Sequence, residues 1–154
     1  MDLVAKYFSA DMTSTESNRA NTFYPPADLE MINQTERILS TKLPKDYVDF
    51  LLQTNGYEGQ VGQSYSIFTP VDKIEEFTQL YGTQFFPWII FIGTDGGGEM
   101  YVIDKRTNPL QFGLLPFISS DEDFIPLGDT FEEFIKHLYD NDFWTTTDES
   151  NVVD

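Results

Sequence analysis

The sequence contains no cysteine, one histidine and few basic residues. Without cysteine the chain cannot form disulfides, thiolate metal sites or a cysteine nucleophile. One histidine and no cysteine also cannot build the common ligand shells of zinc. No apolar run reaches the roughly 18 residues needed to cross a bilayer, and the start, with an early Asp2, does not resemble a secretory signal. We therefore expect a cytoplasmic protein that does not insert into a membrane.

Basic side chains are outnumbered throughout the chain. Twenty-six acids oppose nine lysines and arginines, which gives a formal charge of −17, and after residue 118 eleven acids face only Lys136. Such a surface repels nucleic acid and anionic membranes, because both need cationic groups to replace their counterions. It attracts a protein partner with a cationic surface and steers its approach. The alternative, that the acidity serves solubility alone, is equally compatible with the composition.

The length and the aromatic content predict one domain with a real core. The chain has 154 residues, of which 14 are phenylalanine, 8 tyrosine and 2 tryptophan, and aromatic side chains supply large apolar areas for burial. The first residues are polar and show no sustained period. We predict an N-terminal arm over residues 1–25, loosely structured or with a short helix near residues 3–8, a single domain over 26–144 and a polar tail over 145–154.

Periodicity and turn residues predict the secondary structure of the domain. The last helix has the clearest pattern, because Thr130 and Glu133 form a capping box ahead of a stripe of apolar residues from Phe131 to Tyr139. An earlier stripe contains Leu29, Ile32, Ile38 and Leu39. The predicted helices cover residues 25–40, 45–54, 71–80 and 130–139, and the second of them is expected to stop at a left-handed Asn55-Gly56. The predicted strands cover residues 65–69, 88–92, 100–103 and 110–118, the last as an irregular edge strand. Residues 57–64 are predicted as a loop.

These elements predict an α+β fold. Helices at both ends with strands between them favour a central, mainly antiparallel and possibly mixed sheet packed with helices. The short connections do not fit repeated βαβ crossovers.

The stretch PWIIFIGTDGGGEMYVID, residues 87–104, is the most informative part of the sequence. Two strand-like runs flank a glycine-rich turn that carries Asp95 and Glu99. A phosphate cradle is disfavoured, because the turn lacks the Gly-Lys-Ser/Thr pattern and its carboxylates repel phosphate. The acids also lack the spacing of a calcium loop, although a divalent ion completed by Asp104 or by distant acids stays open. We favour a structural turn whose exposed acids contact a partner.

Other candidate groups are weak as catalytic residues. His137 lies beside the apolar stripe of the last helix, where a surface role is more common than that of a base. Adjacent acids such as Glu75-Glu76 and Glu132-Glu133 do not provide two carboxylates held apart across a cleft. The run Asp121-Glu122-Asp123 precedes Phe124. An exposed Phe124 ringed by acids would be a binding patch, whereas a buried Phe124 would leave the acids merely solvated, and both alternatives stay open.

Three segments in this order resemble the SMI1/KNR4 family, also called the SUKH superfamily. The first is Leu43-Pro44-x-x-Tyr47-x-x-Phe50-Leu51 with Asn55-Gly56; the second is Ile92-Gly93-x-Asp95-Gly96-Gly97-Gly98-Glu99-x-Tyr101; the third is Phe131-x-x-Phe134-Ile135 after Leu127-Gly128. The resemblance implies an SMI1/KNR4-like α+β fold. It also implies kinship with bacterial immunity proteins, which neutralise polymorphic toxins, many of them nucleases, and with fungal regulators of the cell wall and signalling. The family has no established catalytic residues to carry over.

The leading hypothesis is a non-enzymatic immunity protein that occupies the cationic active-site surface of a toxin through Asp95, Glu99, Asp121, Glu122 and Asp123. It needs no cofactor, metal or catalytic residue, and it binds neither nucleic acid nor membrane. One alternative is a regulatory or scaffold module without a toxin partner. A third option is a metal-dependent enzyme that uses the Asp95/Glu99 turn.

Overall fold

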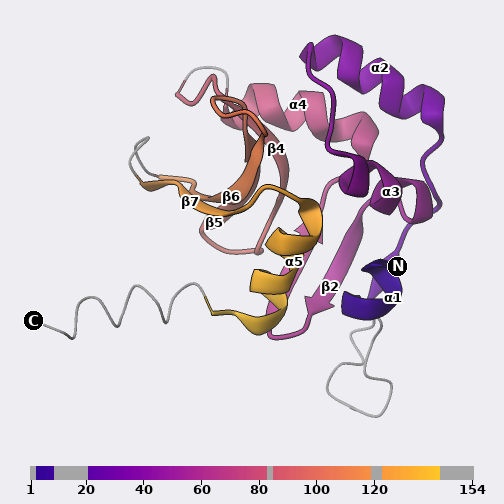
Figure 1. Cartoon of the computed structure of the whole chain (residues 1–154), viewed down its shortest axis with the longest axis vertical. Coiled ribbons are helices and arrows are strands. Elements are labelled where there is room, and N and C mark those ends of the chain that lie inside the picture. Colours follow the sequence, from indigo (N-terminus) through magenta and orange to yellow (C-terminus); the bar gives the residue numbers. More distant parts are fainter. Residues whose placement is uncertain (1–2, 9–20, 83–84, 119–122, 143–154) are drawn as a thin grey trace, which may run out of the picture.

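The chain folds into one antiparallel sheet with helices on both faces (Figure 1). The computed structural model describes residues 3–8, 21–82, 85–118 and 123–142. Within them the helices are α1 (Leu3–Tyr7), α2 (Leu29–Leu39), α3 (Lys45–Gln53), α4 (Val71–Tyr81) and α5 (Phe131–Asp140). The strands are β1 (Thr22–Phe23), β2 (Tyr57–Val61), β3 (Ser64–Phe68), β4 (Ile89–Thr94), β5 (Glu99–Asp104), β6 (Gln111–Pro116) and β7 (Ile125–Gly128).

The seven strands lie in the sheet in sequence order, and every neighbouring pair is antiparallel. The predicted α+β class with a mainly antiparallel sheet is therefore confirmed. Two helices separate β1 from β2, and α4 separates β3 from β4. After each of these helical segments, the next strand pairs with the strand that precedes the segment. The predicted hairpin of β4 and β5 is present around the glycine-rich turn.

Two predictions about strands are wrong. Residues 57–64 form most of the β2–β3 hairpin rather than a loop, and Gly62 supplies the left-handed residue (φ 56°) of its tight turn. The glycines of this segment indicated a loop, but the alternating burial of β2 comes from pairing with β3, which local composition does not reveal. The segment 110–118 contains β6, which is not an edge strand, because β7 pairs with its outer side.

Hydrogen bonds at the helix ends explain where the helices begin and end. Asp28 caps α2 by accepting from the backbone N–H of Met31 at 2.8 Å, and Ser40 ends it in the left-handed region. The predicted left-handed stop after α3 is wrong at Asn55: α3 ends at an extended Thr54, and the Asn55 side chain instead accepts from the N–H of Val71 at 2.7 Å, so that it caps α4.

The predicted apolar stripe of α2 is only partly correct. Leu29 and Ile38 are more than half exposed, whereas Ile32 is buried together with Thr35 and Glu36. The reason is tertiary: α2 packs against α4 rather than directly on the sheet, as Figure 1 shows at the top of the molecule, so a narrower face of it is covered.

The sheet separates two hydrophobic clusters, because successive side chains of a strand point to opposite faces. Ile90 and Ile92 of β4 belong to the larger cluster, which also contains core residues of α1, α3 and α5. Ile89 and Phe91 belong to the smaller cluster beneath α4. Both faces are covered, which explains why residues 88–92 form a continuous apolar run rather than an alternating one.

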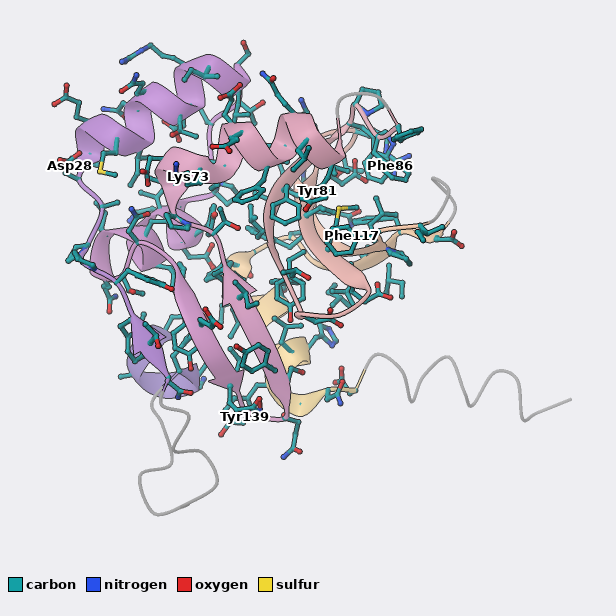
Figure 2. The ribbon with its side chains drawn as sticks, turned by 180° about the vertical axis from the view of Figure 1, so that it is seen from behind. Asp28, Lys73, Tyr81, Phe86, Phe117 and Tyr139 are labelled. Atoms are coloured by element: carbon teal, nitrogen blue, oxygen red, sulfur yellow. The ribbon has the colours of Figure 1, made fainter. Side chains whose placement is uncertain are left out.

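The smaller cluster is closed by aromatic rings from α4 and from the end of β6. The rings of Tyr81 and Phe117, labelled in Figure 2, meet edge to face with their centroids 5.1 Å apart. Phe91 packs beneath Tyr81 at 5.2 Å. This cluster fixes α4 on the β4–β6 half of the sheet, on the face opposite α5.

The N-terminal helix is part of the larger cluster. Phe8, which directly follows α1, is fully buried, with its ring 4.8 Å from that of Tyr57 and 5.2 Å from that of Phe50. The division of the chain into an arm, a domain over residues 26–144 and a tail stays a prediction. In the part of the chain that the structure describes, no helix has the length and apolar character to cross a membrane.

Candidate functional site: the acidic turn and the adjoining pocket

The β4–β5 turn is built by the side chain of its first acid. Asp95 Oδ1 accepts hydrogen bonds from the backbone N–H groups of Gly97 at 2.8 Å and Glu99 at 3.2 Å. The Asp95 N–H donates to the carbonyl of Glu99 at 3.2 Å. Aspartate commonly fixes a turn in this way, when its carboxylate accepts hydrogen bonds from backbone N–H groups that follow it in the chain. Asp95 therefore has a structural role in addition to its charge.

Two of the glycines are required by close approach of the backbone. Gly93 lies where β3 meets β4, and a Cβ atom there would stand 2.4 Å from the carbonyl oxygen of Ile67. Gly96 has φ 82°, a region that L side chains rarely adopt, and its Cβ would lie 3.3 Å from the Tyr65 ring. A Cβ on Gly98 would meet open space. The turn thus brings its backbone against β3 and presents Asp95 beside Tyr65.

Glu99, at the start of β5, is a carboxyl group in an unfavourable environment. Its Oε1 atom is buried and has no hydrogen-bond partner among the described residues. Burial, followed by the charges of Asp95 and Asp123, raises the pKa of Glu99 to about 7. Loss of water disfavours the charged form, and neighbouring carboxylates act in the same direction. The structure therefore brings three of the five predicted contact residues close together, whereas Asp121 and Glu122 lie outside the described residues.

Phe124 is packed rather than exposed as an anchor. Its ring meets that of Trp88 edge to face at 5.5 Å, and it covers Gly113, where a Cβ would lie 2.6 Å from the ring. Phe124 is half-buried, which lies between the exposed and the buried alternative that the sequence left open. Asp123, next to it, is exposed.

A small polar pocket adjoins the turn on the α5 face of the sheet. It has a volume of about 180 Å³ and is lined by Gln63, Ser64, Tyr65, Asp95, Tyr101, Leu114 and Asn141. These residues come from β3, β5, β6, the β2–β3 and β4–β5 turns, which lie at the same end of the sheet, and the residue that follows α5. Apart from Asp95, sequence reasoning did not select them as a site. No single segment carries a signal for them, because the fold alone brings them together.

Tyr101 lines this pocket and is buried. Its hydroxyl lies 2.9 Å from Ser66 Oγ, and it donates to the carbonyl of Tyr65 at 3.3 Å. Burial is the main cause that raises the pKa of Tyr101 above its usual value, so the hydroxyl stays protonated. Tyr101 is therefore a neutral group in the lining, to which Asp95 contributes the carboxyl group.

Asp104 does not join the acidic turn. It lies at the other end of β5, on the order of 17 Å from Glu99 for a strand of this length. It is buried and accepts hydrogen bonds from Arg106 Nε at 3.0 Å and from the Arg106 backbone N–H at 2.8 Å. Arg106 in turn stacks on Trp88, with its Cζ 3.5 Å from the ring centroid. Asp104 therefore cannot complete a metal site at the turn, and no group of three or more His, Asp or Glu in residues 3–8, 21–82, 85–118 and 123–142 is arranged to hold a metal ion.

His137 lies on α5 with its side chain about 42% exposed, and its Nδ1 is 2.7 Å from Asp142 Oδ1. This arrangement links the last turn of α5 to the residues that follow it. A histidine near a helix C-terminus interacts favourably with the helix dipole when it is protonated.

The three segments of the sequence pattern occupy defined places in this structure. The Leu43-Pro44 segment starts α3, the glycine-rich turn joins β4 to β5, and Thr130 and Asp46 cap the N-terminus of α5, whose Phe131, Phe134 and Ile135 are fully buried. Comparison with curated proteins gave no match. The family model of the SMI1 / KNR4 family (SUKH-1) matches residues 26–137, which is most of the chain. Members of this family include immunity proteins, which act by binding other proteins. On this match the chain belongs to the SMI1/KNR4 family (SUKH-1).

Proposed function

We propose that this protein is a non-catalytic immunity protein that acts in the cytoplasm and blocks a toxin by binding its cationic active-site surface. The observation that carries the proposal is the cluster of Asp95, Glu99 and Asp123 at one end of the sheet, in a chain with a net charge of −17. A toxin that acts on nucleic acid needs a cationic surface, and a rigid acidic protein can occupy that surface in place of phosphates. Family membership supports a role in protein binding.

The acidic cluster is suited to this role because its backbone is fixed. Asp95 is held by the turn that it caps, and the Glu99 N–H and carbonyl both take part in that turn. Pre-organised charges lose little conformational entropy on binding. The carboxyl of Glu99 also gains from a cationic partner, since a nearby positive charge favours its ionised form.

Co-expression with candidate toxins tests the proposal directly. We expect the wild-type chain to rescue growth and to co-purify with one toxin. Reversing Asp121, Glu122 and Asp123 to lysine should abolish or weaken rescue and slow association. The matched control reverses three exposed acids on the opposite layer, Glu30, Asp72 and Glu76, and should rescue as the wild type does.

Salt dependence separates the electrostatic proposal from its competitors. Association should slow markedly between low and physiological salt, because charges further apart than the Debye length of about 8 Å are then screened. A toxin complex that is indifferent both to salt and to the 121–123 reversal would contradict binding through these acids.

The second candidate function is a regulatory or scaffold module that binds a partner other than a toxin. It is favoured by apolar side chains left exposed around the ends of α2 and α4: Ile38 is 54%, Leu80 66% and Phe85 71% exposed. A hollow of about 190 Å³ lies between these helices. The neighbouring genes discriminate between the immunity and the scaffold function, because a gene for a large secreted toxin next to this one favours immunity. A partner that binds equally well at low and at high salt favours the scaffold.

The third candidate, a metal-dependent enzyme at the Asp95/Glu99 turn, has a simple test. Titration calorimetry and thermal unfolding with calcium, magnesium and manganese should show no heat and no shift of the unfolding temperature if the turn is a protein-binding surface. Saturable heat with any one of these ions, abolished by Asp95→Asn, would favour the enzyme over the immunity protein.

A further inference from the structure

The pocket beside the acidic turn is too small for a cofactor and large enough for one side chain. Its volume of about 180 Å³ lies below the range of roughly 300–1,000 Å³ that is typical of small-molecule sites. It holds the equivalent of about six water molecules at roughly 30 Å³ each. A single long side chain from another protein fits this volume.

The lining offers hydrogen-bond acceptors around one negative charge. The Oδ1 atom of Asp95 is engaged by the turn, but its Oδ2 atom accepts no hydrogen bond within the described part of the chain. Gln63, Ser64 and Asn141 also line this space, and each has a side-chain oxygen that can accept a hydrogen bond. Oxygen acceptors at several points of the wall match the several N–H donors of a guanidinium or ammonium group.

Two further features favour a positive occupant. Tyr65 and Tyr101 are among the lining residues, and an aromatic face that is turned towards a cation attracts it. Asn141 is the C-cap of α5, so the negative end of that helix dipole points at the pocket. Lys136 of α5 does not compete for Asp95, because it pairs with Asp140 at 3.2 Å.

A larger hollow elsewhere on the molecule is unsuited to a cation. It measures about 480 Å³ at the end of α2 and is lined by Arg37 and Lys42 together with Glu36. The Glu36 carboxylate already accepts from the Leu43 backbone N–H at 2.8 Å and from Lys42 Nζ at 3.4 Å. Charge complementarity therefore distinguishes the pocket at Asp95 from the larger hollow.

We propose that the pocket lined by Asp95, Tyr65 and Asn141 receives one arginine or lysine side chain of a protein partner, with the cationic group bound at Asp95 Oδ2. The inference rests on the proposed function in one respect: it takes the partner to be a protein with a cationic surface. It adds a specific anchor to that surface. Arginine is one of the residue types enriched among the few side chains that dominate the affinity of an interface.

The pocket can be tested on the chain alone with small probes. N-acetyl-arginine amide, titrated to millimolar concentrations, should shift the backbone amide NMR signals of Ser64, Tyr65 and Asn141 saturably. N-acetyl-citrulline amide has nearly the same shape without the charge, and it should leave these signals in place. Equal shifts with both probes, or arginine shifts spread over the whole acidic surface, would overturn the proposal.

Two variants and a matched control sharpen the test. Asp95→Asn removes the charge but keeps an oxygen that can accept from the Gly97 and Glu99 N–H groups, so the turn should persist; we expect probe binding to weaken at least about tenfold. Gln63→Trp places a bulky ring in the pocket from an exposed turn and should abolish binding. Asp49→Asn makes the same charge change on α3 and should bind the probe as the wild type does.

The outcomes for the pocket and for the proposed function are separable. If no toxin is neutralised but the arginine probe binds at Asp95, the immunity function fails and the pocket stands. If a toxin is neutralised and its complex survives both Asp95→Asn and Gln63→Trp with unchanged affinity, the function stands and the pocket proposal fails.

Discussion

At the scale of single residues, Asp95 and Glu99 have different physical roles although both belong to one turn. Asp95 is satisfied by two backbone donors, whereas the Oε1 atom of Glu99 is buried without a partner in the described structure. The sequence shows two acids four positions apart, but it does not indicate which of them is hydrogen-bonded and which is buried without a partner. Burial and the approach of Asp123 make the difference, and both come from the fold.

The raised pKa of Glu99 predicts a specific pH dependence of stability. Between its ordinary value near 4.5 and about 7, the folded protein keeps a proton that the unfolded chain releases, so the free energy of unfolding from this group falls as the pH rises. A glutamine side chain cannot ionise, so Glu99→Gln removes this decrease in the free energy of unfolding. Its unfolding free energy relative to the wild type should increase from about pH 5 to about pH 8, measured by urea unfolding.

The matched control for this measurement is Glu76→Gln, which changes an exposed glutamate on α4. Its difference from the wild type should stay constant over the same pH range. A Glu99→Gln difference that is independent of pH would show that Glu99 titrates normally in the folded protein.

At the scale of secondary-structure elements, the N-terminus of α5 is held by a residue of α3. Asp46 accepts from the backbone N–H groups of Phe131 at 3.0 Å and Glu132 at 2.9 Å, and Thr130 accepts from Glu133 at 3.1 Å. The capping box at Thr130 and Glu133 was predicted from the sequence, and its Thr130 bond is confirmed. The Asp46 cap was not predicted, because its donors lie 85 positions further along the chain.

Removal of this cap should cost substantial stability. Asp46→Ala leaves two backbone donors and the positive end of the α5 dipole without a partner, so we expect a loss of about 1–2 kcal/mol in the free energy of unfolding. Asp49→Ala, in the same helix, removes only an exposed pair with Lys45 and should cost less than about 1 kcal/mol. Chemical denaturation measures both, and equal losses would contradict the interhelical cap.

At the scale of the whole molecule, the excess of acids acts on stability as well as on binding. Ion pairs such as Lys45–Asp49 and Lys136–Asp140 are local and largely exposed, and each such pair contributes little. The repulsion among the remaining acids is long-ranged, because 26 acids face only 9 lysines and arginines. Repulsion should therefore dominate the response of the folded state to salt.

This balance predicts that salt stabilises the protein. Raising sodium chloride from about 10 mM to about 150 mM shortens the Debye length from roughly 30 Å to about 8 Å and screens the repulsion. The midpoint of thermal unfolding should rise, and potassium chloride at the same ionic strength should give the same rise. A midpoint that falls with salt would show that the local ion pairs outweigh the net repulsion.

The sequence by itself determined the elements whose signals are local. Periodic apolar residues with caps predicted α3, α4 and α5 to within a few residues, and the glycine-rich turn predicted the β4–β5 hairpin. Such signals depend on neighbours three or four positions apart, or on the φ angle of a single turn residue. The same segments, in their order, also carried the family resemblance.

Tertiary structure alone decided the role of β2, the inner position of β6 and the composition of the pocket. Strand pairing compensates for the weak local preference of the glycine-containing segment Tyr57–Val61, and β7 covers the side of β6 that composition suggested was an edge. The pocket joins Tyr65, Asp95 and Asn141 from three distant segments. Contacts of this kind follow from sheet register and helix docking, which no local sequence pattern encodes.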